Sequence, residues 1–422
     1  AITAGTNPRL RPSERAAVIE TAAPKLVIAA EDHVAGIPDD QEVELIRLAD
    51  APDTILGELR LPGQVPVAMP ADLDRPVCIC FSSGSTGDPK GALFANRQLA
   101  AIAELDTGGA WGGGGHRIAP TEFAHIGIMT KLPWLLAAGG TTHLLTKWRA
   151  ADVVDLIDRH RISAVTGVAP QIALMLRVEG IEERDFSCVK AVVVGGSASP
   201  PALVREARRI FGAPYLIRYS STECGGVGLG TSPEADDEEA LHTIGRPRPG
   251  IEATVRGPDG HLVPDGETGE LWLRSRAIMS EYWRAPEATA ETLVDGWLRT
   301  GDLATIDDRG LFRLTGRIKE MFIRGGYNVY PAEIERVLTD HPAVAEVAVV
   351  PRPDDVMGEI GVAVLGVRPG VAAPTLDDLR AFAADRLAGY KLPEAIRVLD
   401  QLPRNGTDKV DRRMLVEHET AT

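Results

Sequence analysis

The sequence contains few cysteines and no long apolar run. Its four cysteines, Cys78, Cys80, Cys188 and Cys224, show neither Cys-x-x-Cys spacing nor an accompanying group of histidines. This pattern disfavours a zinc site and a disulfide framework, and it fits a reducing cytoplasm. No apolar run reaches the roughly 18–20 residues of a membrane-spanning helix, and the N-terminus does not resemble a signal peptide. We therefore expect a cytoplasmic protein without a membrane span.

Basic and aromatic residues are also scarce. There are 45 Lys and Arg against 60 Asp and Glu, which gives a formal net charge of −15. This excess of acidic residues disfavours nucleic acids and anionic membranes as partners. Because aromatic residues make up only 5% of the chain, the core must consist mainly of Ala, Val, Leu and Ile, as is usual for α/β proteins. A chain of 422 residues is longer than a domain with one hydrophobic core usually is, so two or more domains are expected.

One polar stretch, Ser-Ser-Gly-Ser-Thr-Gly-Asp-Pro-Lys-Gly at residues 82–91, stands between two apolar segments. The segments 77–81 and 92–95 have the pattern of paired strands in a hairpin. Glycines, hydroxyls and Lys90 together suit a phosphate ligand. The stretch is not a Walker P-loop, because Pro89 precedes the lysine and Gly91 follows it. The alternative is an ordinary turn between strands.

Helix and strand patterns alternate through the first half of the chain. The run 189–194 reads as a buried parallel strand whose C-terminal end opens into Gly195, Gly196 and Ser197, the edge at which open α/β sheets bind ligands. Ser13 and Asn96 are the expected N-caps of two helices. The expected helices span 13–23, 96–105, 126–138, 151–159, 170–176 and 201–211, and the expected strands span 25–29, 142–145, 164–167, 189–194 and 215–218.

The second half of the sequence has a different pattern of expected helices and strands. Short strands such as 251–255 and 269–274 indicate a β-rich subdomain. Beyond Arg317, strands at 344–350 and 362–367 and a helix at 376–387 indicate a small α+β domain. The expected fold class is α/β: a large N-terminal α/β domain, residues 1–317, with a β-rich subdomain, and a small mobile α+β C-terminal domain, residues 318–422.

Residues 82–91 resemble the phosphate loop of the adenylate-forming superfamily, which includes acyl-CoA synthetases, nonribosomal adenylation domains and luciferases. Further motifs of the superfamily follow in the expected order, so the resemblance covers nearly the whole chain. It also implies that an N-terminal segment is absent before Ala1. The matching segments are Tyr-Ser-Ser-Thr-Glu at 219–223, with Ser220 in place of the usual glycine, Thr-Gly-Asp at 300–302, and the segments 315–320, 325–335 and 402–412.

The resemblance implies a nucleotide site. In it, Tyr219 stacks on adenine, Thr222 contacts the phosphates, Glu223 holds Mg²⁺ as a hard oxygen ligand, Asp302 accepts the ribose hydroxyls and Arg317 lies beside the ribose. The alternative for the segment 219–223 is an exposed helix cap. The full set of expected nucleotide-binding residues is Ser82, Ser83, Gly84, Ser85, Thr86, Gly87, Lys90, Gly195, Gly196, Ser197, Tyr219, Ser220, Thr222, Asp302, Arg317 and Lys409.

The chemistry implied by the resemblance is activation of a carboxylic acid. Attack of a carboxylate oxygen on the α-phosphorus of ATP gives an acyl adenylate and pyrophosphate, and its anionic transition state needs cations and donors held in place. Lys90, Thr222, Glu223 and Lys409 are the expected catalytic residues, and Lys409 is the mobile cation. Lys319 is the expected hinge between the domains. Asp408 stands where the superfamily usually has glycine, and its carboxylate would weaken the positive potential at Lys409.

Further matches concern the acid and the acceptor. His125 resembles the histidine of the acyl pocket in acyl-CoA ligases, although a histidine satisfied within the core is equally compatible with the sequence. No acidic residue lies between Phe123 and Pro133, where amino-acid-activating domains carry an aspartate, so a simple carboxylic acid is favoured, with Gly225 and Gly226 leaving space beside it. The residues expected to line the pantetheine tunnel are Gly325, Gly326 and Tyr327, which also form a loop before a helix at Pro331.

The sequence therefore predicts an ATP-dependent acyl- or aryl-CoA ligase with ATP, Mg²⁺ and coenzyme A as cofactors. One alternative is an acyl-AMP ligase that loads the phosphopantetheine of a carrier protein. Another is a non-catalytic nucleotide-binding relative, suggested by the absent start and by Asp408. The identity of the acid and the oligomeric state are left open, with a homodimer as the first hypothesis.

Overall fold

The computed structural model describes residues 1–37, 43–48, 63, 65, 69–82, 89–119, 121–145, 147–405 and 409–420. The chain divides into two compact units. Unit 1 comprises Ala1–Ala253 and Leu273–Arg299, and unit 2 comprises Thr254–Trp272 and Thr300–Thr422. The predicted mobile division at residues 317 and 318 stays a prediction. Over the described ranges, none of the helices has the length and apolar character needed to cross a bilayer.

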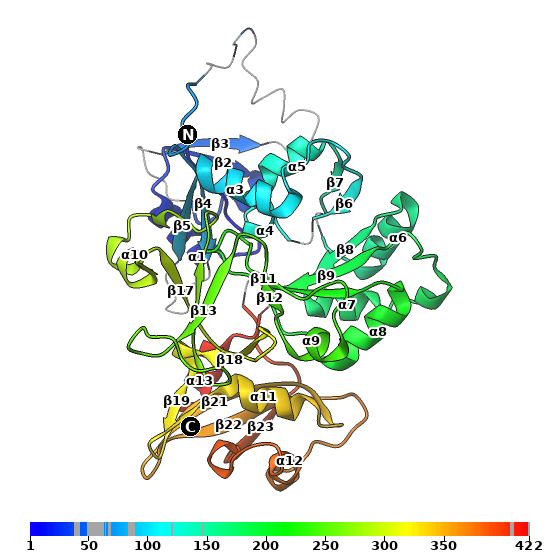
Figure 1. Cartoon of the computed structure of the whole chain (residues 1–422), viewed down its shortest axis with the longest axis vertical. Helices are drawn as coiled ribbons and strands as arrows, with labels where there is room; N and C mark the ends of the chain where they lie inside the picture. The colour runs from blue at the N-terminus through cyan, green and yellow to red at the C-terminus, as the bar shows by residue number, and fades with distance from the viewer. Residues whose placement is uncertain are drawn as a thin grey trace. The chain divides into compact units, whose positions relative to one another are not determined.

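The first sheet of unit 1 contains the predicted hairpin. Strands β4 and β5 pair antiparallel, and the register places Ser82 opposite Lys90. Helices α1 and α3 pack against β5 (Figure 1). The sheet order is β1-β4-β5-β15, and the elements are β1 (Thr3–Ala4), α1 (Pro12–Ala22), β4 (Pro76–Ser82), β5 (Lys90–Ala95), α3 (Asn96–Thr107) and β15 (Glu281–Tyr282).

Both predicted helix caps in this region are wrong. Helix α1 begins at Pro12 after the N-cap Arg11, because proline has the required φ and lacks only an N–H that is unpaired at a helix start. Helix α3 begins at Asn96 itself, with Ala95 as the N-cap. The Gln98 side chain accepts the Ala95 N–H at 3.0 Å, while Asn96 Nδ2 donates to the carbonyl oxygen of Asp72 at 2.8 Å.

The second sheet of unit 1 has the order β12-β11-β10-β9-β8. Strands β8, β9 and β10 are parallel to one another, which confirms the parallel strand predicted over 189–194. Figure 1 shows α6, α7 and α8 packed around these strands, and Val192, Ile172 and Val204 belong to the core between them. The elements are α6 (Ala150–His160), β8 (Ala164–Gly167), α7 (Ala169–Met175), β9 (Ala191–Gly195), α8 (Pro201–Phe211), β10 (Tyr215–Tyr219), β11 (Leu229–Gly230), α9 (Asp237–His242) and β12 (Arg246–Pro247).

The helix predicted over 126–138 is interrupted. Helix α4 (Ile126–Met129) ends and α5 (Leu132–Ala138) begins anew, because Pro133 has no N–H to continue the ladder. Thr130 Oγ1 instead donates to the carbonyl oxygen of Ile126 at 2.8 Å. The remaining elements of unit 1 are the parallel pairs β2 (Leu26–Ala30) with β3 (Glu44–Leu48) and β6 (His116–Ile118) with β7 (Thr141–His143), together with η1 (Glu31–His33), η2 (Ile181–Glu183), α10 (Pro286–Thr292) and β16 (Leu293–Val294).

A further sheet corresponds to the predicted β-rich segment. Its order is β13-β14-β17-β16, and β18 pairs with β17. The division between the units falls within β13, β14 and β17, so each of these three strands contributes residues to both units. The bounds are β13 (Glu252–Arg256), β14 (Gly269–Arg274), β17 (Trp297–Ile306) and β18 (Phe312–Arg317).

The last hundred residues form the predicted α+β arrangement. Side chains along β21 alternate between two faces: Val349 packs with Ile334 of α11 and Leu379 of α12, whereas Val350 packs with Leu415 of α13. Helix α12 ends at Ala383 rather than at the predicted residue 387. The sheet order is β20-β19-β22-β21, with β23 beside β22, and the elements are η3 (Ile318–Glu320), β19 (Phe322–Arg324), β20 (Tyr327–Val329), α11 (Pro331–Thr339), β21 (Val344–Asp354), β22 (Gly358–Val367), α12 (Leu376–Ala383), η4 (Gly389–Lys391), β23 (Ala395–Leu399) and α13 (Arg412–Thr420).

Candidate active site

The ends of the predicted phosphate loop lie side by side. Ser82 closes β4, Lys90 opens β5, and Ser82 Oγ donates to the carbonyl oxygen of Lys90 at 3.4 Å. The β4–β5 register therefore fixes where the intervening loop leaves and re-enters the sheet. Its predicted ligands Ser83, Gly84, Ser85, Thr86 and Gly87, and also Asp88, lie outside the described residues.

Tyr282 connects Lys90 with Glu223. Its Oη donates to Glu223 Oε1 at 2.8 Å, and Lys90 Nζ lies 5.4 Å from the centroid of its ring. Burial, followed by the charge of Glu223, raises the pKa of the Tyr282 phenol well above its usual range, so the hydroxyl stays a donor. The sequence alone did not predict a role for Tyr282. It occupies a two-residue strand paired with β5, and no local spacing relates it to Glu223.

The turn after β10 holds the predicted Thr222 and Glu223. The Glu223 carbonyl accepts the Met279 N–H at 2.8 Å, and the Thr222 carbonyl accepts the Gly225 N–H at 3.1 Å. Burial raises the pKa of the neighbouring Cys224 thiol, which keeps it protonated and unsuited to nucleophilic chemistry. The backbone bonds of Thr222 and Glu223 thus help to hold the turn, and the Glu223 carboxylate is held by Tyr282.

Gly195 shows how the two predicted nucleotide segments meet. It pairs with Arg218 across β9 and β10, and a Cβ at Gly195 would lie 2.7 Å from the Arg218 carbonyl oxygen. Gly196 has a φ of +78° and Ser197 is exposed. Because the strands are parallel, the loop that starts at Gly196 and the segment that starts at Tyr219 leave the same edge of the sheet. The structure therefore brings these predicted residues together.

The backbone conformation by itself requires glycine at two predicted positions of the acyl pocket. Gly225 and Gly226 both have a φ of +72°, and a Cβ at Gly225 would lie 2.6 Å from the carbonyl oxygen of Ala277. His125 Nδ1 accepts the Gly127 N–H at 3.1 Å and caps α4. His125 is exposed, so it is not the buried core residue that the alternative interpretation required.

A buried ion pair supports Gly226. Lys131 Nζ donates to Asp106 Oδ2 at 2.6 Å and to the Gly226 carbonyl oxygen at 3.3 Å, while Arg248 donates to Asp106 Oδ1 at 3.1 Å. Burial lowers the pKa of Lys131, and the Asp106 carboxylate opposes that shift. These residues were not predicted from the sequence, because they come from three separate segments and fit no motif.

Unit 2 brings together three predicted residues from distant parts of the sequence. Asp302 pairs with Arg317 across β17 and β18, and Arg317 Nε lies 2.9 Å from Asp302 Oδ1. Lys409 is near enough for the charges of both side chains to act on its pKa. Desolvation and then the Arg317 guanidinium lower the pKa of Lys409, whereas the Asp302 carboxylate raises it. The Asp302 side chain is 12% exposed and the Arg317 side chain is 57% exposed.

Glu270, which fits no motif of the sequence, supports the Thr-Gly-Asp segment. This buried carboxylate accepts the Gly301 N–H at 3.1 Å and the Trp272 indole N–H at 3.0 Å. Thr300 Oγ1 donates to the Leu271 carbonyl oxygen at 2.6 Å and accepts the Asp302 N–H at 3.1 Å. The position of the Asp302 carboxylate is therefore set by two neighbouring strands.

Gly325 and Gly326 form the two-residue turn between β19 and β20. Their φ values are +54° and +85°, as a type I′ hairpin requires. A Cβ at Gly326 would meet nothing within 4 Å. The Tyr327 ring stacks on Tyr390, with centroids 4.6 Å apart. Lys319 is exposed in η3. The tunnel and hinge roles of these residues stay predictions.

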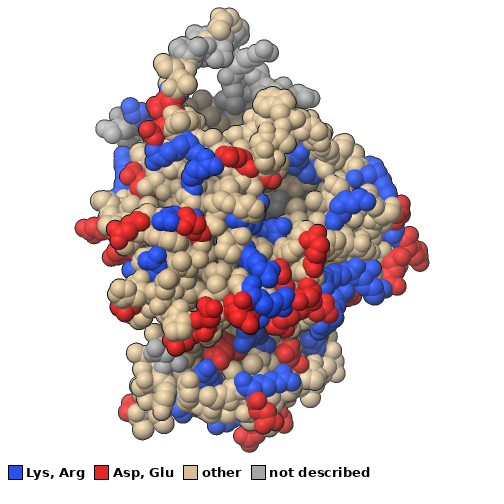
Figure 2. Space-filling view, in the orientation of Figure 1, with Lys and Arg blue, Asp and Glu red and all other residues tan. Residues whose placement is uncertain are grey.

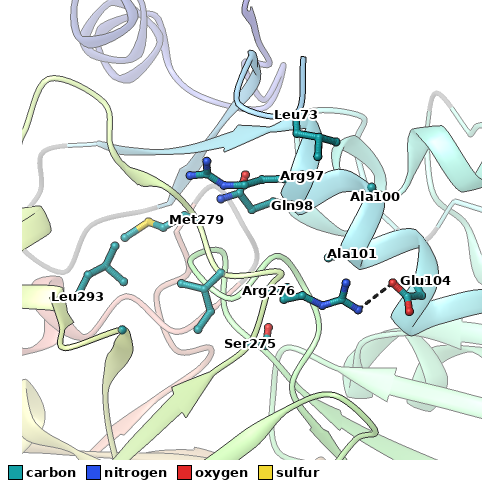
Figure 3. A pocket seen from close by; sticks show the side chains of 12 residues that line it. Leu73, Arg97, Gln98, Ala100, Ala101, Glu104, Ser275, Arg276, Met279 and Leu293 are labelled. Atoms are coloured by element: carbon teal, nitrogen blue, oxygen red, sulfur yellow. Dashed lines mark hydrogen bonds and ion pairs between the residues drawn. The ribbon is translucent and has the colours of Figure 1, made fainter. Parts of the chain in front are cut away.

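Unit 1 also contains a cavity of about 530 Å³. Arg97 and Gln98 line it from α3, and an ion pair of 2.8 Å between Arg276 and Glu104 lies at its wall (Figure 3). Met279, another wall residue, is bonded through its N–H to the Glu223 carbonyl. Through Met279 the cavity adjoins the turn that holds Glu223. None of the residues predicted for the acyl pocket lines the cavity, so the cavity is not that predicted pocket.

Two family models of known proteins match successive parts of the sequence. Residues 1–283 match the AMP-binding enzyme family and residues 333–409 match the AMP-binding enzyme C-terminal domain. A fatty acid–[acyl-carrier-protein] ligase from Streptomyces coeruleorubidus is 36% identical over 349 residues, covering 81% of this chain and 67% of that protein. An indoleacetate–CoA ligase from Aromatoleum aromaticum is 37% identical over 360 residues, covering 82% of this chain and 68% of that protein.

A solved structure of similar fold contains a nucleotide. The o-succinylbenzoate coenzyme A synthetase of Bacillus subtilis, in complex with ATP and a magnesium ion, aligns with a TM-score of 0.82 at 27% identity. The alignment covers 97% of this chain and 83% of that one. The predicted fold class and superfamily are therefore confirmed.

Proposed function

The chain belongs to the AMP-binding enzyme family of the adenylate-forming superfamily, and we propose that it is an ATP-dependent acyl- or aryl-CoA ligase. One observation carries this proposal. Arg317 contacts Asp302 within unit 2, and Lys409 is near enough to both for their charges to act on its pKa, although these residues were predicted separately for catalysis and for ribose binding. A lysine beside a ribose-binding acid is suitably placed to act on the α-phosphate of the same nucleotide.

In the first reaction, a carboxylate oxygen of the acid forms a bond to the α-phosphorus of ATP. The bond from that phosphorus to the bridging oxygen breaks, and pyrophosphate leaves. Lys409 would neutralise negative charge that develops on the α-phosphoryl oxygens. Asp302 would orient the ribose by accepting its hydroxyls, and Arg317 would fix the Asp302 carboxylate through their 2.9 Å contact. Lys90 would bind phosphate oxygens at the start of β5.

Magnesium fits the residues around Glu223. A carboxylate is the ligand type that Mg²⁺ prefers, and one hydrogen bond from Tyr282 leaves lone pairs on both Glu223 oxygens. When bound, Mg²⁺ would neutralise phosphate charge. Tyr282 holds Glu223 in a fixed orientation, and the Lys90 ammonium over the Tyr282 ring adds a second positive charge nearby.

In the second reaction, the CoA thiol would attack the acyl carbon, and AMP would leave with the bond electrons. We propose that Gly325, Gly326 and Tyr327 line the path of the pantetheine. The open space at Gly326 within its own unit supports this role. We also propose that residues 318–422 move as one body about Lys319 between the two reactions, and that the protein forms a homodimer.

A carrier-protein phosphopantetheine is the second candidate acceptor. It is favoured by the relative from Streptomyces coeruleorubidus, which is a fatty acid–[acyl-carrier-protein] ligase. The CoA ligase relative acts on indoleacetate, so aromatic acids belong among the candidate substrates. On the face shown in Figure 2, basic side chains are interspersed with acidic ones rather than gathered in one broad patch, which gives no support to nucleic acid as a partner.

The decisive experiment is ATP–pyrophosphate exchange with a panel of aliphatic, alicyclic and aromatic acids. We expect exchange with one class of acid, and we expect CoA to accelerate AMP release with that acid. Faster release with a phosphopantetheinylated carrier protein than with CoA would identify the second candidate. ATP binding without exchange for any acid, and without thioester formation from supplied acyl-AMP and CoA, would contradict ligase activity and favour a non-catalytic relative.

A further inference from the structure

Three histidines from distant parts of the sequence lie together in unit 1. They are His116 in β6, His143 in β7 and His160 at the end of α6. One ring nitrogen of each lies within 4.8 Å of the others, and His116 Nδ1 is 2.9 Å from His143 Nε2. None of the three is assigned above to ATP, the acid or CoA. The sequence disfavoured a zinc site because it shows no metal-binding spacing, but the fold assembles a histidine cluster.

The fold explains how the three rings meet. Strands β6 and β7 are parallel, and His143 pairs with Ile118, two residues after His116. Because side chains two apart point to one face of a strand, His116 and His143 are diagonal neighbours on the same face. His160 is the last residue of α6, an eleven-residue helix whose C-terminal carbonyls favour a positive charge nearby.

The three imidazole rings pack closely together. The rings lie with centroids 4.5–5.2 Å apart. Two ring nitrogens 2.9 Å apart require that at least one of them carry a lone pair. A neutral imidazole with an available lone pair is the form that binds metal ions.

We propose that His116, His143 and His160 form a site for one first-row divalent transition-metal ion such as Zn²⁺, with water completing the coordination. Imidazole suits Zn²⁺, Cu²⁺ and Ni²⁺, whereas the hard Mg²⁺ ion used with ATP prefers oxygen ligands. The two nearest nitrogens are already close enough to share one ion. Tetrahedral nitrogen ligands about 2.1 Å from zinc lie about 3.4 Å apart, a separation between the 2.9 Å of the nearest pair and the 4.8 Å that bounds all three.

A metal ion bound at this site would stabilise the fold of unit 1. The ion joins β6 and β7 to the end of α6, and α6 belongs to the core of the second sheet of unit 1. Metal binding to the native state therefore stabilises this unit. The site needs no part in the adenylation reaction, so its test does not depend on the proposed ligase activity.

The test uses the full chain without an affinity tag, so that no added histidines compete. Co²⁺ is added first, because tetrahedral Co²⁺ absorbs strongly in the visible and free aqueous Co²⁺ does not. The Zn²⁺ affinity is then measured by competition with a chromophoric chelator. We expect one ion per chain, bound at least about tenfold more weakly by H143A and by H160A, since even outer-shell partners of a metal contribute that much. H261A is the matched control, because His261 is an exposed histidine outside the cluster.

Thermal unfolding gives the second measurement. Zn²⁺ is expected to raise the unfolding midpoint of the wild type and of H261A, and to raise that of H160A by less. No stoichiometric binding by the wild type would overturn the proposal. Equal affinity in the wild type, H143A and H160A would overturn it as well, and so would a sulfur-to-Co²⁺ charge-transfer band, which would show that a cysteine binds the ion.

Discussion

Tyr282 Oη donates a 2.8 Å hydrogen bond to Glu223 Oε1 across 59 positions of sequence. The same ring carries the Lys90 ammonium 5.4 Å from its centroid. One tyrosine thus links the start of β5, where the predicted phosphate loop ends, to the turn that holds the proposed magnesium ligand. Its own strand, β15, is anchored by pairing with β5. Glu223 is therefore positioned by the phosphate-loop strand itself.

We expect Tyr282→Phe to weaken adenylation while leaving the fold intact. The ring and its contact with Lys90 remain, but Glu223 loses a hydrogen bond of the charged type, which contributes about 1.5–3 kcal/mol. The kcat/KM of ATP–pyrophosphate exchange should fall about tenfold or more, and the Mg²⁺ concentration for half-maximal exchange should rise. Tyr390→Phe, which keeps the stack on Tyr327, is the matched control. Unaltered exchange and Mg²⁺ dependence in Tyr282→Phe would refute the positioning role.

Lys409→Ala separates the two reactions. Loss of the cation that meets the α-phosphate should lower the rate of acyl-adenylate formation by a factor of about 100 or more. Thioester formation from supplied acyl-AMP and CoA should persist, because that reaction does not form the new bond at phosphorus. Stopped-time assays of each half-reaction provide the measurement, with the exposed Lys190→Ala as the control. Equal loss in both half-reactions would contradict the role given to Lys409.

The pH dependence of adenylation should report on Lys409. Desolvation and Arg317 lower its pKa, and only the protonated lysine carries the required charge, so activity should be lost at alkaline pH, below the usual lysine range. The Asp302 carboxylate raises this pKa. Asp302→Asn should therefore move the alkaline limb of kcat, measured at saturating ATP, to lower pH. A limb that moves upward or stays in place would show that Asp302 does not act on the titrating group.

A large side chain at position 326 should selectively impair the reaction with CoA. Gly326 and Gly370 have similar φ values, +85° and +77°, and a Cβ at either would meet nothing within 4 Å. Gly326→Trp and Gly370→Trp therefore carry comparable backbone strain, but only the former places an indole in the proposed tunnel. We expect the KM for CoA to rise at least about tenfold in Gly326→Trp, with exchange of pyrophosphate retained. Identical CoA saturation in the two variants would argue against the tunnel.

The elements of the fold follow largely from local sequence. The apolar segments around residues 82–91 predicted the hairpin in which Ser82 faces Lys90, and the β-branched run ending at Val194 predicted a buried parallel strand. Both depend on side-chain alternation and apolar burial, which a short window reveals. The helix N-caps were harder to predict. Ser13 and Asn96 have side chains suited to an N-cap, but Ser13 is the second residue of its helix and Asn96 is the first.

Only the tertiary structure decided which distant residues act together. Tyr282 with Glu223, Glu270 with Gly301, Lys131 with Asp106, and the three histidines are each joined across 17 or more positions. A contact of this kind depends on how strands and helices pack, and no period in the sequence encodes it. The sequence determined the superfamily and the residues suited to its chemistry. The packing determined how those residues are oriented, since buried polar groups must find partners wherever the fold brings them.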